Sequence, residues 1–363
     1  MRYRKVDKGL IVTTLLLVVF GLLMVYSASS VVAMYKYNDQ FYFIKRQALF
    51  AIIGVVMMFI FMKINIEKIY KASTYIFITS IVLLILVLIP GIGVVRGGAR
   101  SWIGFGSFSI QPAEFVKVAL ILFLSTTICK INYKINKFKY FLLLFGIIVL
   151  VFGLIMLQPD FGTGLVIVLS SILVLFISGV SIKYFLALGI LGILGLVFLI
   201  ASAPYRLERI FAFLDPWSDP LGSGFQAIQS LFSIAPSGIF GLGFNNSMQK
   251  HFFLPEPQND FIFAIICEEL GLIGGLALIG AFIYIVIKLI ILSTKMSDNR
   301  HKLTLIAVAS NLFVQVFINL GVVIGLLPVT GITLPIISYG GSSLIFTLIM
   351  LGLCINISKY REV

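Results

Sequence analysis

Long apolar runs recur along the entire chain, and residues 142–157, LLLFGIIVLVFGLIML, are typical of them. A run of about 20 apolar residues lets an α-helix cross the ~30 Å hydrocarbon layer of a membrane. Hydrophobic residues fill 60% of the 363 positions and charged residues only 11%, which excludes a soluble globular domain. The runs therefore predict an all-α polytopic membrane protein whose function concerns lipid, or a molecule that crosses it.

Ten such runs can be distinguished, and each predicts one transmembrane helix. They cover residues 10–29, 47–64, 73–90, 111–129, 139–157, 162–180, 184–202, 260–292, 304–326 and 340–357. Basic residues before the first run, followed by Ser27-Ala28-Ser29, imitate a signal peptide. Because nine further runs follow, we interpret the first as an uncleaved span. The whole chain, 1–363, is then one membrane domain.

The basic residues predict the orientation. With the N-terminus inside, 18 of the 27 Lys and Arg residues fall in cytoplasmic segments and eight in outer segments. Positive residues accumulate on the cytoplasmic side of membrane proteins, so we expect both termini to be cytoplasmic. The net charge of +13 reflects this topology and an attraction to anionic lipids. It does not favour a nucleic-acid partner.

Acidic residues gather in a different place. Seven of the 14 lie within residues 203–269, which open with a predicted large outer loop, 203–259. Loops of this length are usually functional or disordered. The stretch YRLERIFAFLDPW is aromatic and amphipathic, which favours short helices at the outer membrane interface. The seven acids are Glu208, Asp215, Asp219, Glu256, Asp260, Glu268 and Glu269.

A second polar cluster, RGGARSWIGFGSFSIQPAEFVKVA, occupies residues 96–119. Its glycines and Trp102 predict a tight outer loop with an aromatic anchor, and proline at position 112 suits the first turn of a helix. Glu114 and Lys117 lie three residues apart, hence on one helix face. They form either an ion pair that fixes packing or a site for an anionic headgroup, since ionisable residues at membrane depth are often functional.

Two smaller features add to this pattern. In QPDFG, residues 158–162, Asp160 can cap the next helix. The stretch GLLPVTGITLPIISYGGSS, residues 325–343, contains two prolines and two glycine-rich turns where a helix would otherwise continue. Irregular backbone at membrane depth must be buried in protein or line a cavity. Close helix packing is the structural alternative, and we favour a cavity wall that faces the outer loop.

This arrangement favours one catalytic base rather than a pair of acids. On a straight helix, Glu268 would lie about 12 Å deeper than Asp260 and on another face, so we expect Glu268 and Glu269 to contact other helices. Transfer from a sugar diphosphate needs a carboxylate that takes a proton from the attacking hydroxyl. Asp260 can supply it, while basic side chains hold the phosphates. The candidates for phosphate binding are Arg100, Lys117, Arg206, Arg209 and Lys250.

Nucleotide sugars are not available outside a bacterial-type cell, so the expected donor is carried on a membrane lipid diphosphate. For Asp260 the structural alternative is an N-cap of the eighth span. Glu256 either shapes the loop or holds a divalent cation together with Asp260. No cofactor is evident otherwise, although Mg²⁺ or Mn²⁺ would suit this chemistry. With two histidines, and cysteines only inside predicted spans, we expect neither a zinc site nor a disulfide.

Several ordered motifs resemble the SEDS family (shape, elongation, division and sporulation), which includes FtsW, RodA and SpoVE. They are GARSWIGFGSFSIQPAEFVKVA, QPDFGTGLVIV, YRLERIFAFLDPWSDPLGSGFQAIQSLFSI, HFFLPEPQNDFIFAIICEELGLIGG and PVTGITLPIISYGGSSL. The resemblance spans residues 10–358 and is closest to the FtsW and SpoVE branches. Two departures stand out: Gln258-Asn259 precede Asp260 where many relatives have His-Thr, and Arg100 is followed by Ser101.

This resemblance implies a ten-helix peptidoglycan glycosyltransferase that polymerises lipid II outside the membrane. It implies that Asp260 is the required carboxylate, and that Arg100, Trp102 and Lys117 belong to the substrate site. The implied partners are a class B penicillin-binding protein and other membrane proteins of division or sporulation. Two alternatives stay open: a flippase that moves lipid II across the bilayer, and a scaffold without enzymatic activity.

Overall fold

The computed structural model describes residues 5–362 except 97, 106–107, 202–206, 208–210 and 212. Within these residues each predicted apolar run overlaps one long helix. The ten helices are α1 (Lys8–Tyr37), α2 (Tyr42–Lys63), α3 (Ile66–Leu86), α4 (Pro112–Ile131), α5 (Phe138–Met156), α6 (Phe161–Ile177), α7 (Ile182–Ala201), α10 (Ile262–Thr294), α11 (Asn299–Val323) and α12 (Gly341–Ile357).

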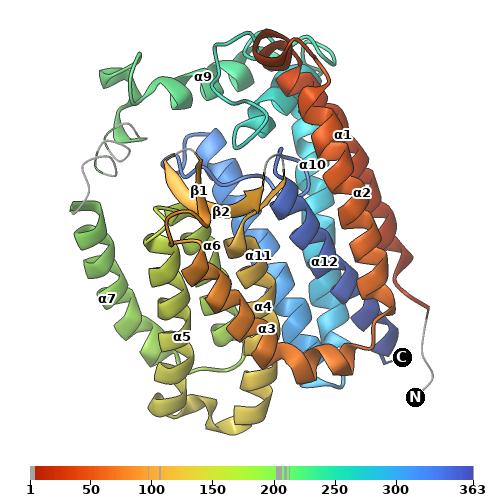
Figure 1. Cartoon of the computed structure of the whole chain (residues 1–363), viewed down its shortest axis with the longest axis vertical. Coiled ribbons are helices and arrows are strands. Elements are labelled where there is room, and N and C mark those ends of the chain that lie inside the picture. The colour runs from red at the N-terminus through yellow and green to blue at the C-terminus, as the bar shows by residue number, and fades with distance from the viewer. Residues whose placement is uncertain are drawn as a thin grey trace.

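Seven of the described helices are long and apolar enough to cross a membrane by length and composition. They are α1, α2, α3, α5, α10, α11 and α12. The helices run roughly side by side along the long axis of the molecule, and both termini lie at the same end (Figure 1). Helix α11 is the most central: it contacts α4, α6, α10 and α12, and it is buried nearly all round.

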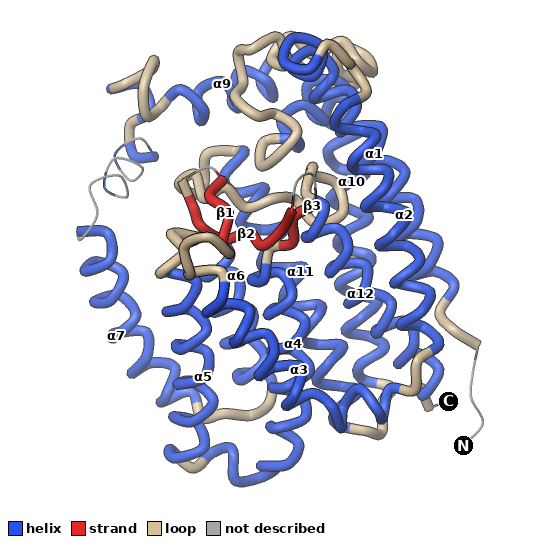
Figure 2. Tube along the Cα trace, viewed as in Figure 1, coloured by secondary structure: helices blue, strands red, loops and turns tan. Residues whose placement is uncertain are grey.

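The loop after α3 forms a small antiparallel sheet, which the sequence did not predict. Strands β1 (Gly93–Arg96), β2 (Ala99–Phe105) and β3 (Phe108–Ile110) lie in the order β1-β2-β3. Val94 pairs with Trp102, and a bulge follows between Val94 and Val95. Figure 2 shows the sheet lying across the ends of the long helices, on the side away from the termini. The strands are short and rich in glycine, so their sequence resembles an irregular loop.

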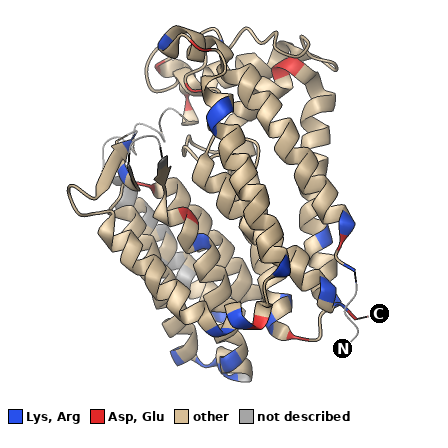
Figure 3. Cartoon of the chain, turned by 45° about the vertical axis from the view of Figure 1, so that its right-hand side comes forward, with Lys and Arg blue, Asp and Glu red and all other residues tan. Residues whose placement is uncertain are grey.

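The segment between α7 and α10 carries α9 (Phe225–Ile234) between two short 3₁₀ helices, η2 (Pro216–Ser218) and η3 (Ala235–Ser237). It lies at the end opposite the termini (Figure 1). Basic residues gather mainly at the end with the termini, as Figure 3 shows. This distribution is the one that the loop charges predicted.

The outer loop is fixed to α10 by a buried cluster of charges, here called the loop anchor: Lys250, Glu268 and Glu269. Glu268 accepts hydrogen bonds from the backbone of Met248 and Gln249. Glu269 accepts them from the backbone of the loop and from the Ser27 hydroxyl of α1. The Lys250 ammonium lies 3.4 Å from a Glu269 oxygen. Buried carboxylates need such donors, so these two acids are structural, as the sequence suggested, although they bind the loop as well as a helix.

A glycine contact joins the loop and α10 directly. Gly271 interrupts α10 with a φ of 66°, and Gly241 opposite it has a φ of 74°. The amides of Leu242 and Gly243 donate to the carbonyls of Glu268 and Glu269, and that of Leu272 donates back to Gly238. A Cβ added at Gly271 would lie 2.3 Å from the Ile239 carbonyl oxygen. Only glycine fits both the backbone conformation and the contact.

We expect Gly271→Ala to destabilise the protein, since a left-handed backbone costs a non-glycine residue about 1–3 kcal/mol before the clash is added. Thermal unfolding in detergent measures the effect. Gly280→Ala is the matched control on the same helix, because a Cβ there meets no atom within 4 Å. Equal melting temperatures for the two variants would contradict the close contact.

Candidate functional site

A cavity of about 470 Å³, here called the polar cavity, lies where the sheet meets the ends of the long helices. Its walls come from six separate parts of the chain between α2 and the start of α12. Among the residues that line it are Arg46, Arg96, Trp102, Gln111, Glu114, Lys117, Asp160, Glu256, Asn259, Asp260, Gln315, Thr333 and Tyr339. Of the catalytic and substrate-binding residues predicted from the sequence, Trp102, Lys117, Glu256 and Asp260 meet here.

Lys117 is one of two buried charges on the α4 wall. Its ammonium lies 2.8 Å from a Glu114 carboxylate oxygen and donates to the Gln315 side-chain oxygen at 3.1 Å. Both charged side chains are almost fully buried. The predicted ion pair is therefore present, and it also faces the cavity, so the packing role and the headgroup role are compatible in this geometry.

Asp260 lies two residues before the start of α10. Helix α10 begins at Ile262, and no side chain bonds to its first amides from the capping position, Phe261. The carbonyl of Asp260 instead accepts a 2.7 Å hydrogen bond from the Asn319 amide of α11. The same amide nitrogen donates to the Ile332 carbonyl. The N-cap position of α10 is Phe261 rather than Asp260, and Asp260 lines the cavity.

Two arginines line the cavity, but Arg100, which the sequence predicted, is not one of them. Arg46, near the start of α2, and Arg96, at the end of β1, line the cavity. The Arg96 guanidinium lies 5.4 Å from the centre of the Trp102 ring, a cation–π contact that holds both at the rim. Arg100 is in β2, and its guanidinium donates to the Leu88 carbonyl at 3.4 Å without lining the cavity.

The other predicted cations lie elsewhere. Lys250 is buried in the loop anchor, where its ammonium donates to the carbonyl and side-chain oxygens of Asn245. Arg206 and Arg209 fall outside the described residues. The sequence analysis did not predict Arg46, because nothing in the sequence around it indicates that the start of α2 lies at this cavity. Arg96 could have been found, since it opens the same motif that contains Trp102.

Arg46 is held by two aromatic residues. Its guanidinium lies 4.4 Å from the centre of the Tyr42 ring and hydrogen-bonds with Tyr339. Burial raises the pKa of the Tyr339 phenol above its ordinary value, and the Arg46 charge opposes this shift. The phenol therefore stays protonated at neutral pH, and it can serve the cavity as a neutral hydrogen-bonding group.

Asp160 caps α6, as the sequence predicted: its carboxylate accepts from the Thr163 amide at 3.1 Å. The second carboxylate oxygen accepts from the Gln111 side chain at 2.8 Å. The Gln111 backbone amide in turn donates to the Ser342 hydroxyl. These bonds connect the starts of α4, α6 and α12 and so fix one wall of the polar cavity.

Glu256 and Asp260 are two of the described carboxylates of the cavity. Glu256 accepts a 2.6 Å hydrogen bond from the Asn259 side chain, and its backbone φ is 45°, so it shapes the loop before α10. Among the described residues, the one cluster with ligand atoms mutually within 4.8 Å is Glu67, Asp298 and His301. There Arg300 already pairs with both carboxylates, far along the chain from the polar cavity.

Comparison with known proteins decides the family. A family model described as a cell cycle protein, FTSW_RODA_SPOVE, matches residues 8–363. The chain belongs to this family. Stage V sporulation protein E of Bacillus subtilis (strain 168) is 49% identical over 357 residues, which cover 98% of each chain. A probable peptidoglycan glycosyltransferase FtsW of Geobacter metallireducens is 39% identical over 97% of this chain and 94% of that protein.

Solved structures agree with this assignment. A structure from work on how a peptidoglycan synthase complex coordinates polymerization and crosslinking superposes with a TM-score of 0.80, at 31% identity, over 98% of this chain and 99% of that one. The crystal structure of Thermus thermophilus rod shape determining protein RodA gives 0.74 at 27% identity, over 98% of each chain. Together with its apolar helices, the family makes this chain a multi-pass membrane protein.

The two kinds of cation can be separated by experiment. We expect Lys250→Met to lower the melting temperature, since it leaves the buried Glu269 without its ion-pair partner, at a cost of about 3 kcal/mol. Arg96→Gln should leave stability unchanged and weaken binding of a polyprenyl diphosphate about tenfold, the value of one charge-assisted hydrogen bond. Unfolding and ligand-binding curves on the same samples test both. The opposite pattern would show that Lys250, not Arg96, serves the site.

Asn319 offers a test of how Asp260 is positioned. Asn319→Leu removes the donor to the Asp260 carbonyl, and a displacement of about 1 Å can cost roughly 100-fold in rate. We expect kcat for polymerisation to fall by about 10- to 100-fold with little change in KM. Asn311→Leu, a buried asparagine on the same helix outside the cavity lining, is the control. Equal kcat values in the two variants would exclude this role for Asn319.

Proposed function

We propose that this protein is a peptidoglycan glycosyltransferase that polymerises lipid II into glycan strands on the outer face of the cytoplasmic membrane. The observation that carries the proposal is the composition of one cavity. The polar cavity combines the Asp260 carboxylate with Arg46, Arg96 and Lys117. These are the groups that transfer from a sugar diphosphate requires, and relatives that match nearly the full chain are named as glycosyltransferases.

In the proposed reaction, the 4-hydroxyl of the acceptor's GlcNAc attacks the anomeric carbon of the donor sugar. A new glycosidic C–O bond forms while the bond between that carbon and the diphosphate oxygen breaks. Asp260 takes the proton of the attacking hydroxyl as general base. The lipid diphosphate leaves with the electron pair of the broken bond, so neither an oxidant nor a reductant is needed.

The basic side chains act on the leaving group. Charge grows on the diphosphate as its bond to the sugar breaks, and fixed cations in a site of low dielectric stabilise that charge. Arginine can bind phosphate oxygens through two parallel hydrogen bonds, which suits Arg46 and Arg96 at the rim. Lys117 lies deeper, and its partner Glu114 holds the ammonium in position. Trp102 keeps Arg96 oriented through the ring contact.

The proposed orientation places both termini in the cytoplasm and the polar cavity outside. It is supported by the basic residues near the termini (Figure 3) and by the location of the cavity at the opposite end of the long helices. The proposed partner is a class B penicillin-binding protein, which would cross-link the strands made here. The similarity to a chain in a structure from work on a peptidoglycan synthase complex supports this pairing.

The decisive experiment compares glycan polymerisation from purified lipid II by the wild type and Asp260→Asn. Each is co-purified with a penicillin-binding partner whose transpeptidase is inactive. We expect Asp260→Asn to lose at least about 100-fold in kcat, the order of a general-base contribution, with unchanged unfolding. Asp219→Asn, an exposed acid of the outer loop bonded to Ser223, is the control. A chelator arm tests the separate proposal of a divalent cation.

Polymer from Asp260→Asn at the wild-type rate would remove Asp260 from the mechanism. Polymer from neither protein, with both folded and partnered, would contradict the enzyme proposal. It would favour the two alternatives, transport of lipid II or scaffolding.

A further inference from the structure

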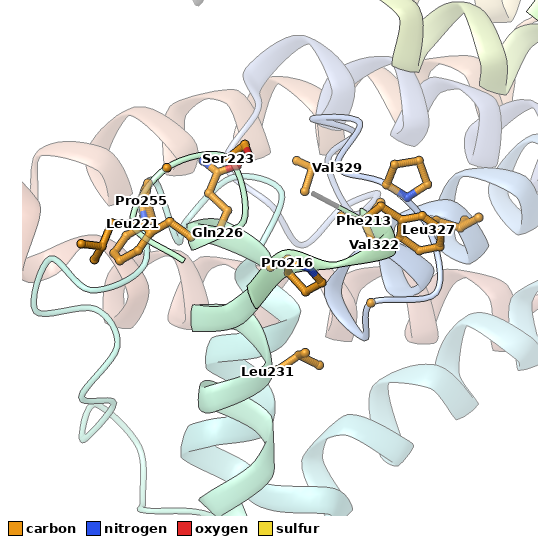
Figure 4. A pocket seen from close by; sticks show the side chains of 15 residues that line it. Phe213, Pro216, Leu221, Ser223, Gln226, Leu231, Pro255, Val322, Leu327 and Val329 are labelled. Atoms are coloured by element: carbon orange, nitrogen blue, oxygen red, sulfur yellow. The ribbon is translucent and has the colours of Figure 1, made fainter. Parts of the chain in front are cut away.

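A second cavity, of about 570 Å³, lies beside the polar cavity and is here called the apolar cavity. Figure 4 shows its walls, which come from the outer loop and α9 and from the end of α11 with the segment that follows. Most of the lining is aliphatic or aromatic: Phe213, Pro216, Leu221, Phe225, Leu231, Val322, Leu327 and Val329 are examples. Its volume is within the range of roughly 300–1,000 Å³ typical of ligand sites.

The two cavities share their partition. Pro255 lines the apolar cavity, and the next residue, Glu256, lines the polar one. Likewise, Val329 lines the apolar cavity and Gly331 lines the polar cavity, with Thr330 between them in the chain. Two short stretches of chain therefore separate an anion-binding space from an apolar space. The side-chain oxygen of Thr330 is buried and has no hydrogen-bond partner, so the partition retains an unused polar group.

This juxtaposition matches a ligand with an anionic head followed directly by an apolar chain. We propose that the apolar cavity binds the first isoprene units of the polyprenyl chain of the donor, whose diphosphate lies in the polar cavity. The inference rests on the proposed function, because it takes the diphosphate as the leaving group of that reaction. By binding this part of the chain, the apolar cavity then positions the donor so that the anomeric carbon of its sugar lies near Asp260.

The lining favours this occupant over a sugar or a peptide. Sugars require several hydrogen bonds, whereas among the described lining residues only Ser223 and Gln226 have polar side chains. Methyl-branched isoprene units bury well against Leu, Val and Pro side chains, and each buried CH₂ contributes about 0.8 kcal/mol. A phospholipid offers a similar combination of anion and apolar chain, so the test must distinguish the two lipids.

The probe is a polyprenyl diphosphate that carries a photoreactive diazirine on an isoprene unit near the diphosphate. After irradiation of the full-length protein with its partner, mass spectrometry locates the label. We expect it within residues 221–231 and 322–329. Excess undecaprenyl diphosphate should abolish the labelling, and excess phosphatidylglycerol should not.

A cavity-filling variant tests the same site through kinetics. Ala227 lines the apolar cavity on α9, and Ala227→Trp should reduce labelling and raise the KM for lipid II about tenfold or more, as expected when apolar groups lose their pocket. Phe232→Trp is the control, since Phe232 lies on the same helix, is about half exposed and does not line the cavity. Melting temperatures of both variants verify folding.

The outcomes separate this inference from the proposed function. Label at other helices, competition by phosphatidylglycerol, or unchanged labelling and KM in a folded Ala227→Trp would each overturn the donor-chain site while polymerisation by the wild type still stood. Specific label in the apolar cavity without polymerisation by the wild type would support the lipid site and contradict the proposed reaction.

Discussion

Side-chain amides satisfy the backbone of the two irregular segments that form the polar cavity, and the site depends on them. No water is available in hydrocarbon to bond an exposed peptide group. Asn319 therefore donates to the carbonyls of Asp260 and Ile332, and Gln315 donates to that of Thr333. From α2, Gln47 both donates to Ser338 and accepts from Gly340. These amides fix the backbone around Asp260 before any substrate is present.

The supply of hydrogen-bond partners also differs between two groups of charges, those of the loop anchor and those of the polar cavity. The carboxylates of Glu268 and Glu269 are surrounded by loop amides, hydroxyls and Lys250, which leaves them little capacity to bind anything else. By contrast, the charges of the polar cavity border open space. Burial alone thus does not mark a catalytic group in this protein. What distinguishes the two groups is that only the charges of the polar cavity line an open space.

The apolar runs were sufficient to predict the ten long helices, because a helix is the simplest structure that bonds its own backbone in lipid. Asp260 and Lys117 could also be predicted to belong together, since a general base and a phosphate-binding cation serve one chemistry; Glu256 was a possible cation ligand beside Asp260, and the family resemblance added Trp102. The sheet could not be predicted, because its strands are short and interrupted by glycine. Arg46 required knowledge of which helix ends adjoin the cavity, and that is a property of tertiary packing. Lys250 looked like any other outer cation, because its burial depends on the distant Glu269.

Because six separate stretches of the chain line the polar cavity, its assembly depends on the order in which the chain is made. Chains emerge from the ribosome with the N-terminus first, so Arg46 enters the membrane with the second long helix, whereas Gly341 arrives with the last. The wall between them cannot close until α12 is in place. A partly inserted chain therefore has the charges of the site but not its enclosure, and catalytic competence coincides with completion of the protein.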